Sequence, residues 1–127
     1  MNELVAEWVS KAESDHTMAD LAMSAGEVPL RDAVCFHAQQ CAEKYLKAFL
    51  TEQHQRFPRT YNLDALLDLC LPFDSTFESF RSKLAALDGH AVAARYPGVR
   101  LTDEMAEQAL AAMHNIRAFM RAKLNLT

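Results

Sequence analysis

Apolar residues recur at steps of three and four along most of the chain, which is the spacing of one face of an α-helix. The pattern predicts a first helix from about Glu3 to Ala25 and a second helix from about Leu30 to His54. The apolar face of the second helix is broad, as expected of a helix that packs on more than one neighbour. No stretch alternates apolar and polar residues in the manner of a β-strand.

Two further helices are indicated by the residues that would cap them. Asn62 is a suitable N-cap for a short helix that ends near Leu71. Thr102 is a suitable N-cap for the last helix, in which Asp103 and Glu104 place negative charge at the positive end of the helix dipole. Apolar residues at helical spacing follow both caps.

A fourth helix is expected between these two, from Ser75 to about Leu87. Ser75 and Glu78 have the spacing of a capping box, in which each side chain satisfies a free backbone N–H of the first turn. Gly89 marks the end of this helix, and residues 89–101 are expected to form an ordered connection, for which a helical start is one option. Five helices with short loops predict an all-α, up-down bundle whose two long N-terminal helices lie antiparallel.

The composition fits one compact domain over residues 1–127. Half of the 127 residues are hydrophobic, which is enough for a core without disulfide bonds. The net charge of −4 argues against a domain that binds nucleic acid through its overall charge, although a local basic cleft stays open. Neither a signal peptide nor an apolar run long enough for a membrane span is visible, so we expect a cytoplasmic protein with no membrane partner.

Cysteine and histidine spacing predicts neither a metal site nor a cofactor. The three cysteines have no close pairing and lie in apolar runs, which indicates buried free thiols rather than disulfides or nucleophiles. His16 has Asp20 four residues later on the same helix face, but one such pair is weak evidence for a metal. The remaining histidines outside the second helix, His54, His90 and His114, have no partners at ligand spacing.

The second helix carries the most unusual polar stretch of the chain. His37, Gln40 and Lys44 are spaced so that they share one helix face, with Arg31 close to the same side. Such a line can hold a phosphate or a nucleotide, with lysine as a point charge, glutamine at a base edge and histidine changing its protonation. Alternatively, Gln40 and Lys44 hydrogen-bond another helix, for example at Asp15.

The sequence Arg95-Tyr96-Pro97 is the second candidate for binding chemistry. Pro97 restricts Tyr96 to an extended backbone, so an arginine and an aromatic ring are presented at a loop. Together they can stack on a nucleobase or clamp a phosphate. The alternative is a structural corner in which Tyr96 packs on the bundle.

These motifs resemble those of the HEPN domain, a small helical domain of prokaryotes and some eukaryotes. The resemblance is strongest over residues 35–44, and it continues in the turn at residues 58–63 and in Arg95-Tyr96-Pro97. It implies a bundle with two long antiparallel helices that usually pairs as a homodimer. It also implies a separate minimal nucleotidyltransferase as a partner, in a system of the toxin–antitoxin type.

Some HEPN proteins are toxins that cleave RNA without a metal, using an arginine and a histidine a few residues apart at the start of the last long helix. Here no histidine follows Arg95 or Arg100 at that spacing. We therefore expect a non-catalytic module that dimerises, binds the nucleotidyltransferase and holds a nucleotide or RNA. The residues expected to bind this ligand are His37, Gln40, Lys44, Arg95 and Tyr96.

Two alternatives remain. In the first, the chain is a metal-independent ribonuclease toxin, with Arg31 or Arg95 clamping the phosphate and His37 transferring protons. In the second, it is a purely structural interaction protein, and the same residues serve only packing and capping.

Overall fold

The structure, a computed structural model, describes residues 1–26 and 29–126, and helices are the regular elements of these residues. This confirms the predicted all-α bundle. None of the helices in the described residues is both long enough and apolar enough to cross a bilayer. The helices are α1 (Glu3–Met23), α2 (Arg31–Glu52), α3 (Leu63–Cys70), the short 3-10 helix η1 (Ser75–Phe80), α4 (Arg81–Arg95) and α5 (Asp103–Lys123).

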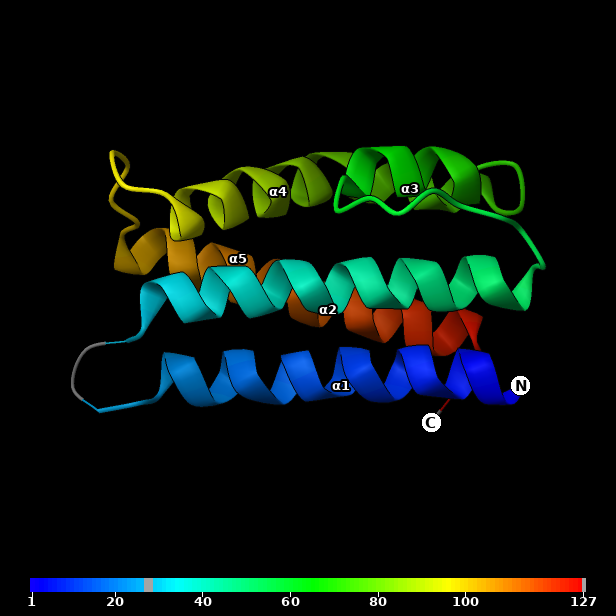
Figure 1. The fold of residues 1–127 in the computed structure, drawn as a ribbon, viewed down its shortest axis with the longest axis horizontal. Helices are drawn as coiled ribbons and strands as arrows, with labels where there is room; N and C mark the ends of the chain where they lie inside the picture. The colour runs from blue at the N-terminus through cyan, green and yellow to red at the C-terminus, as the bar shows by residue number, and fades with distance from the viewer. Residues whose placement is uncertain (27–28, 127) are drawn as a thin grey trace.

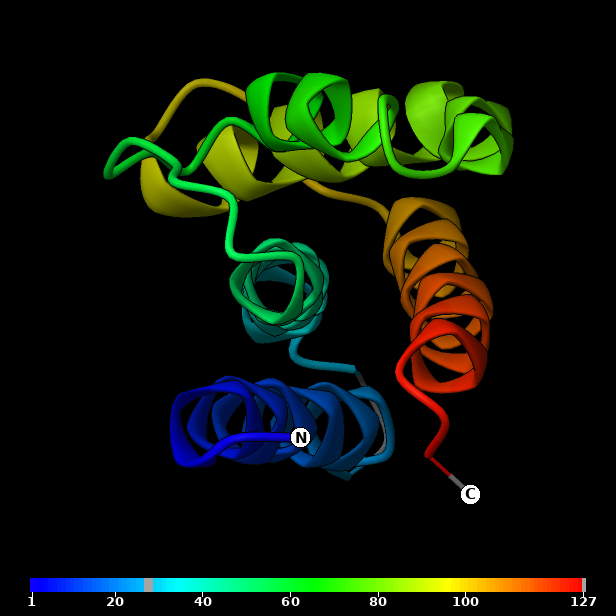
Figure 2. The same cartoon turned by 90° about the vertical axis from the view of Figure 1, so that its right-hand side faces the viewer.

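Helix α2 runs through the middle of the bundle. It lies antiparallel to α1, as predicted (Figure 1). Figure 2, which looks along α2, shows α1 below it, α3 and α4 above it and α5 to one side. No helix of the described residues covers its remaining side, which we call the open face of α2. The half-buried residues of the open face are Phe36, His37, Gln40 and Lys44.

The core surrounds α2 on its three covered sides, which accounts for the broad apolar face read from the sequence. Tyr45, Leu46 and Leu50 of α2 are essentially inaccessible to solvent. Towards the end of α2, the ring of Phe77 in η1 packs between those of Phe49 (centroids 4.7 Å apart) and Phe119 of α5 (5.1 Å). Aromatic contacts of this kind tie η1 and α5 to the centre of the bundle.

The two predicted N-caps are confirmed. Asn62 Oδ1 accepts a hydrogen bond from the backbone N–H of Ala65 (3.1 Å), and Thr102 Oγ1 accepts one from that of Met105 (3.1 Å). The predicted C-terminal ends of the two long helices each lie two residues beyond the observed ends. Beyond α2, His54 already adopts a positive φ of 57°.

A helical segment begins at Ser75 as predicted, as the 3-10 helix η1, but the predicted capping box and the predicted end of the fourth helix are wrong. Asp74, not Ser75, caps the segment, because its carboxylate accepts the backbone N–H of Thr76 at 2.9 Å. Glu78 turns instead to Arg81, whose Nε lies 2.9 Å from Glu78 Oε2. The helix also continues past Leu87 to Arg95, because a glycine in mid-helix costs only about 1 kcal/mol and tertiary packing overrides it.

Candidate functional site

Arg95, the last residue of α4, lies over two aromatic rings on the open side of the bundle. Its Cζ is 5.4 Å from the ring centroid of Phe36 on α2 and 5.4 Å from that of Tyr61 in the loop before α3. Cation–π contacts of this kind hold the guanidinium plane in place. Within residues 1–26 and 29–126, no carboxylate pairs with Arg95, so its positive charge is not neutralised by a neighbour.

Tyr61 is held in position by a buried hydrogen-bond network beneath it. Gln39, which is 1% exposed, donates from Nε2 to the Tyr61 carbonyl (2.8 Å) and to Asp88 Oδ1 (3.1 Å). The other carboxylate oxygen of Asp88 accepts the backbone N–H of Leu63 (2.9 Å), and burial raises the pKa of this carboxyl group. Gln40 donates from Nε2 to Gln39 Oε1 (2.9 Å), so its amide group is part of this network.

His37 and Lys44 share one carboxylate on the neighbouring helix. Nδ1 of His37 lies 2.8 Å from Asp15 Oδ1, and Nζ of Lys44 lies 2.5 Å from Asp15 Oδ2. The hydrogen bond from Lys44 to Asp15 is the packing role that the sequence left open. Since Asp15 takes Nδ1 of His37, Nε2 is the ring nitrogen without a hydrogen-bond partner among the described residues.

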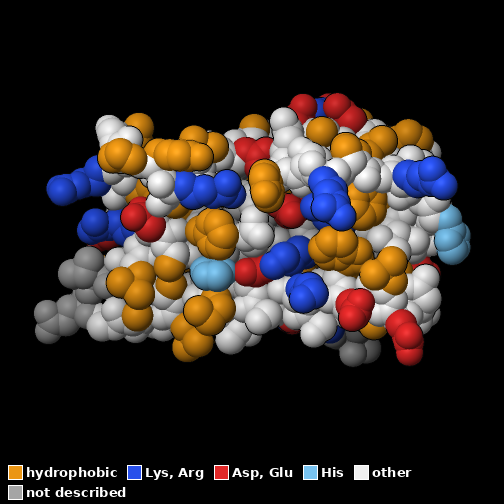
Figure 3. Space-filling view, viewed as in Figure 1, with side chains coloured by type: hydrophobic (Ala, Val, Ile, Leu, Met, Phe, Trp, Pro, Cys, Tyr) orange, Lys and Arg blue, Asp and Glu red, His pale blue; other side chains and the backbone are white. Residues whose placement is uncertain are grey.

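These contacts join the open face of α2 to the end of α4. The ring of Phe36, which Arg95 contacts, also packs edge-on against the ring of His37 (centroids 5.2 Å apart, 83° between planes). Figure 3 looks onto this side and shows Lys, Arg, His and hydrophobic side chains interleaved across its middle, with Asp and Glu side chains among them. Interleaved cationic and aromatic groups are the surface chemistry used to hold single nucleic-acid strands.

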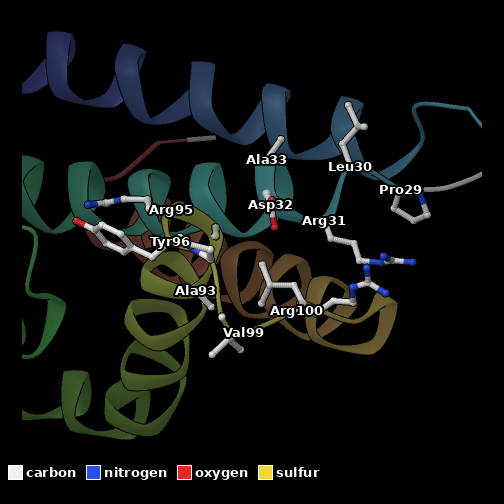
Figure 4. A pocket seen from close by; sticks show the side chains of 14 residues that line it. Pro29, Leu30, Arg31, Asp32, Ala33, Ala93, Arg95, Tyr96, Val99 and Arg100 are labelled. Atoms are coloured by element: carbon white, nitrogen blue, oxygen red, sulfur yellow. The ribbon is translucent and has the colours of Figure 1, made fainter.

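An open cleft of about 940 Å³ adjoins Arg95, between the start of α2, the end of α4 and the loop at residues 96–101. Its cationic lining residues are Arg31, Arg95 and Arg100. Arg31 is paired with Asp103, whereas Arg100 has no carboxylate partner among the described residues. In Figure 4, Arg31 and Arg100 extend to one side of the cleft, and Arg95 and Tyr96 extend to the other.

The loop that carries Tyr96 has the backbone predicted from its proline. Tyr96 is extended (φ −125°, ψ 146°) and its side chain is 64% exposed. Gly98 follows with a φ of 112°, a conformation that disfavours residues with a Cβ. The exposed ring excludes the alternative in which Tyr96 packs into the bundle, and a cleft of this size suits a small ligand.

The sequence-predicted residues therefore divide into two groups. Arg95, Tyr96 and Arg31 line the cleft, while His37 and Lys44 lie on the open face, held by Asp15. Sequence reasoning missed Phe36 and Tyr61 as contacts of Arg95. Both lie inside the motifs that carry the family resemblance, but only the meeting of α2, α4 and the loop before α3 gives them a common partner.

A second cluster, also missed, lies between α1 and α5. Nε2 of His114 is 3.0 Å from Asp20 Oδ1, and Nε2 of His16 is 3.4 Å from Asp20 Oδ2. The expectation that His114 lacks a partner is wrong, because its partner lies 94 residues away in the sequence. The spacing along α1 shows that His16 and Asp20 are neighbours, but it cannot show that His114 of α5 joins them.

Comparison with known proteins agrees with this fold. An archaeal HEPN homologue, ST0689, superposes with a TM-score of 0.74 at 25% sequence identity, covering 97% of this chain and 98% of the other. TT1696 from Thermus thermophilus superposes with a TM-score of 0.75 at 24% identity, covering 97% and 99%, and at that identity it supports the fold alone. Among curated proteins, no sequence matches this chain significantly.

The sequence match to a family model extends over nearly the whole bundle. The model of the HEPN domain matches residues 5–123, from the first turn of α1 to the last residue of α5. The matched segment contains the open face of α2, the Arg95 contacts and the adjoining cleft. This chain belongs to the HEPN domain family.

Proposed function

We propose that this HEPN domain is a non-catalytic module that binds nucleotide units, either free or within RNA. The observation that carries the proposal is the position of Arg95, whose unpaired guanidinium lies over Phe36 and Tyr61 beside an open cleft. Arginine in this setting forms paired hydrogen bonds to a phosphate, and its aromatic neighbours keep its plane fixed.

The cleft provides the other contacts that a nucleotide needs. Arg100 supplies a second cationic group for phosphate, and Arg31 can join it by exchanging Asp103 for the ligand. The rings of Tyr61 and Tyr96 are 66% and 64% exposed and offer faces on which a base stacks. Stacking on an aromatic side chain contributes about 1–3 kcal/mol per base and tolerates any base.

Binding of a labelled oligoribonucleotide, followed by fluorescence anisotropy, tests this proposal. We expect Arg95→Ala to weaken binding by about tenfold or more, because a charged hydrogen bond contributes about 1.5–3 kcal/mol. Arg56→Ala is the matched control, because Arg56 is an exposed arginine just beyond the opposite end of α2. Unchanged binding by Arg95→Ala, or no binding by the wild type, contradicts the proposal.

A competition experiment distinguishes recognition of a free nucleotide from recognition of an RNA strand. If a mononucleotide displaces the oligoribonucleotide, the site recognises the free nucleotide, whereas displacement only by a second oligonucleotide indicates a strand. Binding of the oligoribonucleotide should weaken as the salt concentration is raised, because its phosphate contacts release counterions from the strand.

A ribonuclease is the second candidate, and His37 is the observation in its favour. Asp15 orients the ring through Nδ1, the side chain is 23% exposed, and Phe36 connects it to Arg95. If the chain cleaves RNA in this way, His37→Ala abolishes the fragments seen on a denaturing gel, while His54→Ala does not. If the wild type yields no fragments, the non-catalytic module stands.

The family membership also supports a homodimer and a separate minimal nucleotidyltransferase as partners. Met18 and Leu21 on the outer side of α1 are 46% and 59% exposed, and they provide apolar surface that a dimer interface could bury. Light scattering on the purified chain is expected to give a dimer that Leu21→Lys dissociates. A wild-type monomer, or failure of a co-expressed minimal nucleotidyltransferase to co-purify, contradicts the respective part of this proposal.

A further inference from the structure

Two histidines and an aspartate converge where α5 passes α1, away from the cleft. His16 and Asp20 lie one turn apart on α1, and His114 reaches them from α5. One nitrogen from each histidine and the carboxylate of Asp20 all lie within 4.8 Å of one another. The two imidazole rings meet edge to face, with centroids 5.0 Å apart and 85° between their planes.

We propose that this cluster binds a zinc ion that links α1 to α5. Zinc takes nitrogen and oxygen ligands at about 2.0–2.2 Å in a tetrahedron, which places neighbouring ligand atoms roughly 3.3 Å apart. Each histidine Nε2 lies at about that distance from a different oxygen of Asp20: His114 from Oδ1 (3.0 Å) and His16 from Oδ2 (3.4 Å). The three ligand atoms lie within 4.8 Å of one another, so zinc binding requires the half-exposed His114 ring to move inward, with water as the fourth ligand.

The donor set of the cluster suits a transition metal. Burial lowers the pKa of His16, and the nearby charge of Arg117 contributes. Arg117 does not block the site by its charge, because Glu13 binds it through two hydrogen bonds of 2.7 Å. Two imidazoles among three ligands disfavour Mg²⁺ and Ca²⁺, which prefer oxygen.

The partial exposure of the cluster lets an ion enter without unfolding the bundle. The side chains of Asp20 and His114 are 42% and 43% exposed, whereas that of His16 is 16% exposed. A bound ion would link Asp20, near the end of α1, to His114, in the middle of α5. In the sequence, these two helices are separated by all the other helices of the bundle. Because the folded chain alone brings the three ligands together, zinc should stabilise it, and the stabilisation should grow with the logarithm of the free zinc concentration above Kd.

Titration of the full chain with Zn²⁺, in competition with a chromophoric chelator, tests the proposal. We expect one ion per chain, and affinity losses of at least about tenfold in His114→Ala and in Asp20→Asn. The control is His54→Ala, which removes an exposed histidine outside the cluster and should bind like the wild type. Binding should also weaken as the pH falls and the imidazoles become protonated.

Cobalt provides a readout that a fold defect cannot imitate. Co²⁺ bound by the wild type should give visible bands of a tetrahedral site without the near-ultraviolet band of a thiolate ligand, since the three cysteines are buried. Circular dichroism confirms that each variant is folded before its affinity is compared. The proposal is overturned if the wild type binds no zinc, if the two cluster variants bind as tightly as His54→Ala, or if cobalt shows thiolate ligation.

Discussion

Asp15 is the side chain that fixes the polar half of the open face of α2. It is 7% exposed and accepts hydrogen bonds from both His37 and Lys44. We expect Asp15→Asn to lower the free energy of unfolding by about 1–3 kcal/mol, because a buried charged hydrogen bond is lost and Lys44 keeps its charge. Urea denaturation measures this, with Glu7→Gln at an exposed position of α1 as the control. Equal stability of the two variants would show that the hydrogen bonds of Asp15 do not stabilise the fold.

Glu13 makes the stability of the bundle depend on pH in the acid range. Hydrogen bonds from Arg117 lower the pKa of this carboxyl group from 4.5 to about 2, with Tyr45 contributing. Because the folded-state pKa lies below the unfolded value, the stabilisation is complete above pH 4.5 and is lost as the pH falls towards 2. Denaturant unfolding across this window should show a steeper loss of stability in the wild type than in Glu13→Gln. Parallel curves would contradict this assignment.

The contact or backbone conformation of a single residue was predictable from the sequence where its partner lies on a neighbouring helix or where few conformations are possible. The pairing of Lys44 with Asp15 and the extended backbone of Tyr96 belong to this class. The pairs from Glu13 to Arg117 and from Asp20 to His114 do not, because each joins α1 to α5 across about 100 residues of sequence. The apolar spacing within a helix shows which face is buried, but it does not show which residues of a distant helix that face will meet.

At the scale of elements, two glycines of the same region have opposite roles. Gly89 lies inside α4, and a Cβ built there meets open space. Gly89→Ala should therefore raise the free energy of unfolding by about 0.5–1 kcal/mol. Gly98 has a φ of 112°, so Gly98→Ala should lower it by about 1–3 kcal/mol. Thermal unfolding of the two variants measures both effects, and a destabilised Gly89→Ala would contradict the continuous α4.

The helices themselves follow from apolar spacing, and their ends follow from it less well. Asn62 and Thr102 were predictable because each N-cap is followed at once by an apolar helical face. Gly89 was misread as a helix end because propensity alone cannot register that Leu87 and Ala91 on both sides of it are buried against the bundle. Ser75 was misread as a cap because Asp74, one residue earlier, takes that role.

For the whole molecule, burial of all three cysteines gives a direct measure of global unfolding. Burial raises the pKa of Cys35 to about 11 and that of Cys70 to about 12, and it also raises the pKa of Cys41. We expect none of the thiols to react with a chromogenic disulfide reagent in the native state, and all three to react in parallel with urea unfolding. A thiol that reacts rapidly in the native chain would contradict this burial.

The arrangement of the whole bundle explains why one side of α2 is available for binding. Three sides of α2 are covered by α1, by α3 with α4, and by α5 (Figure 2), and the aromatic and cationic residues of the fourth side are only half-buried. With a net charge of −4, attraction for phosphate depends on local groups of cations, such as Arg31, Arg95 and Arg100 of the cleft. The family resemblance supplied the expectation of a ligand, and the Arg95 contacts are the reason that we propose this location for it.

The most direct test of nucleotide binding at this location is two-dimensional NMR of the labelled chain during addition of a mononucleotide and then of a short oligoribonucleotide. We expect concentration-dependent shifts of the Arg95 side-chain Nε–H and of the rings of Phe36, Tyr61 and Tyr96, with the ring of His114 unaffected. A spectrum in which those four side chains do not move with either ligand, or in which shifts lie only elsewhere, would contradict it.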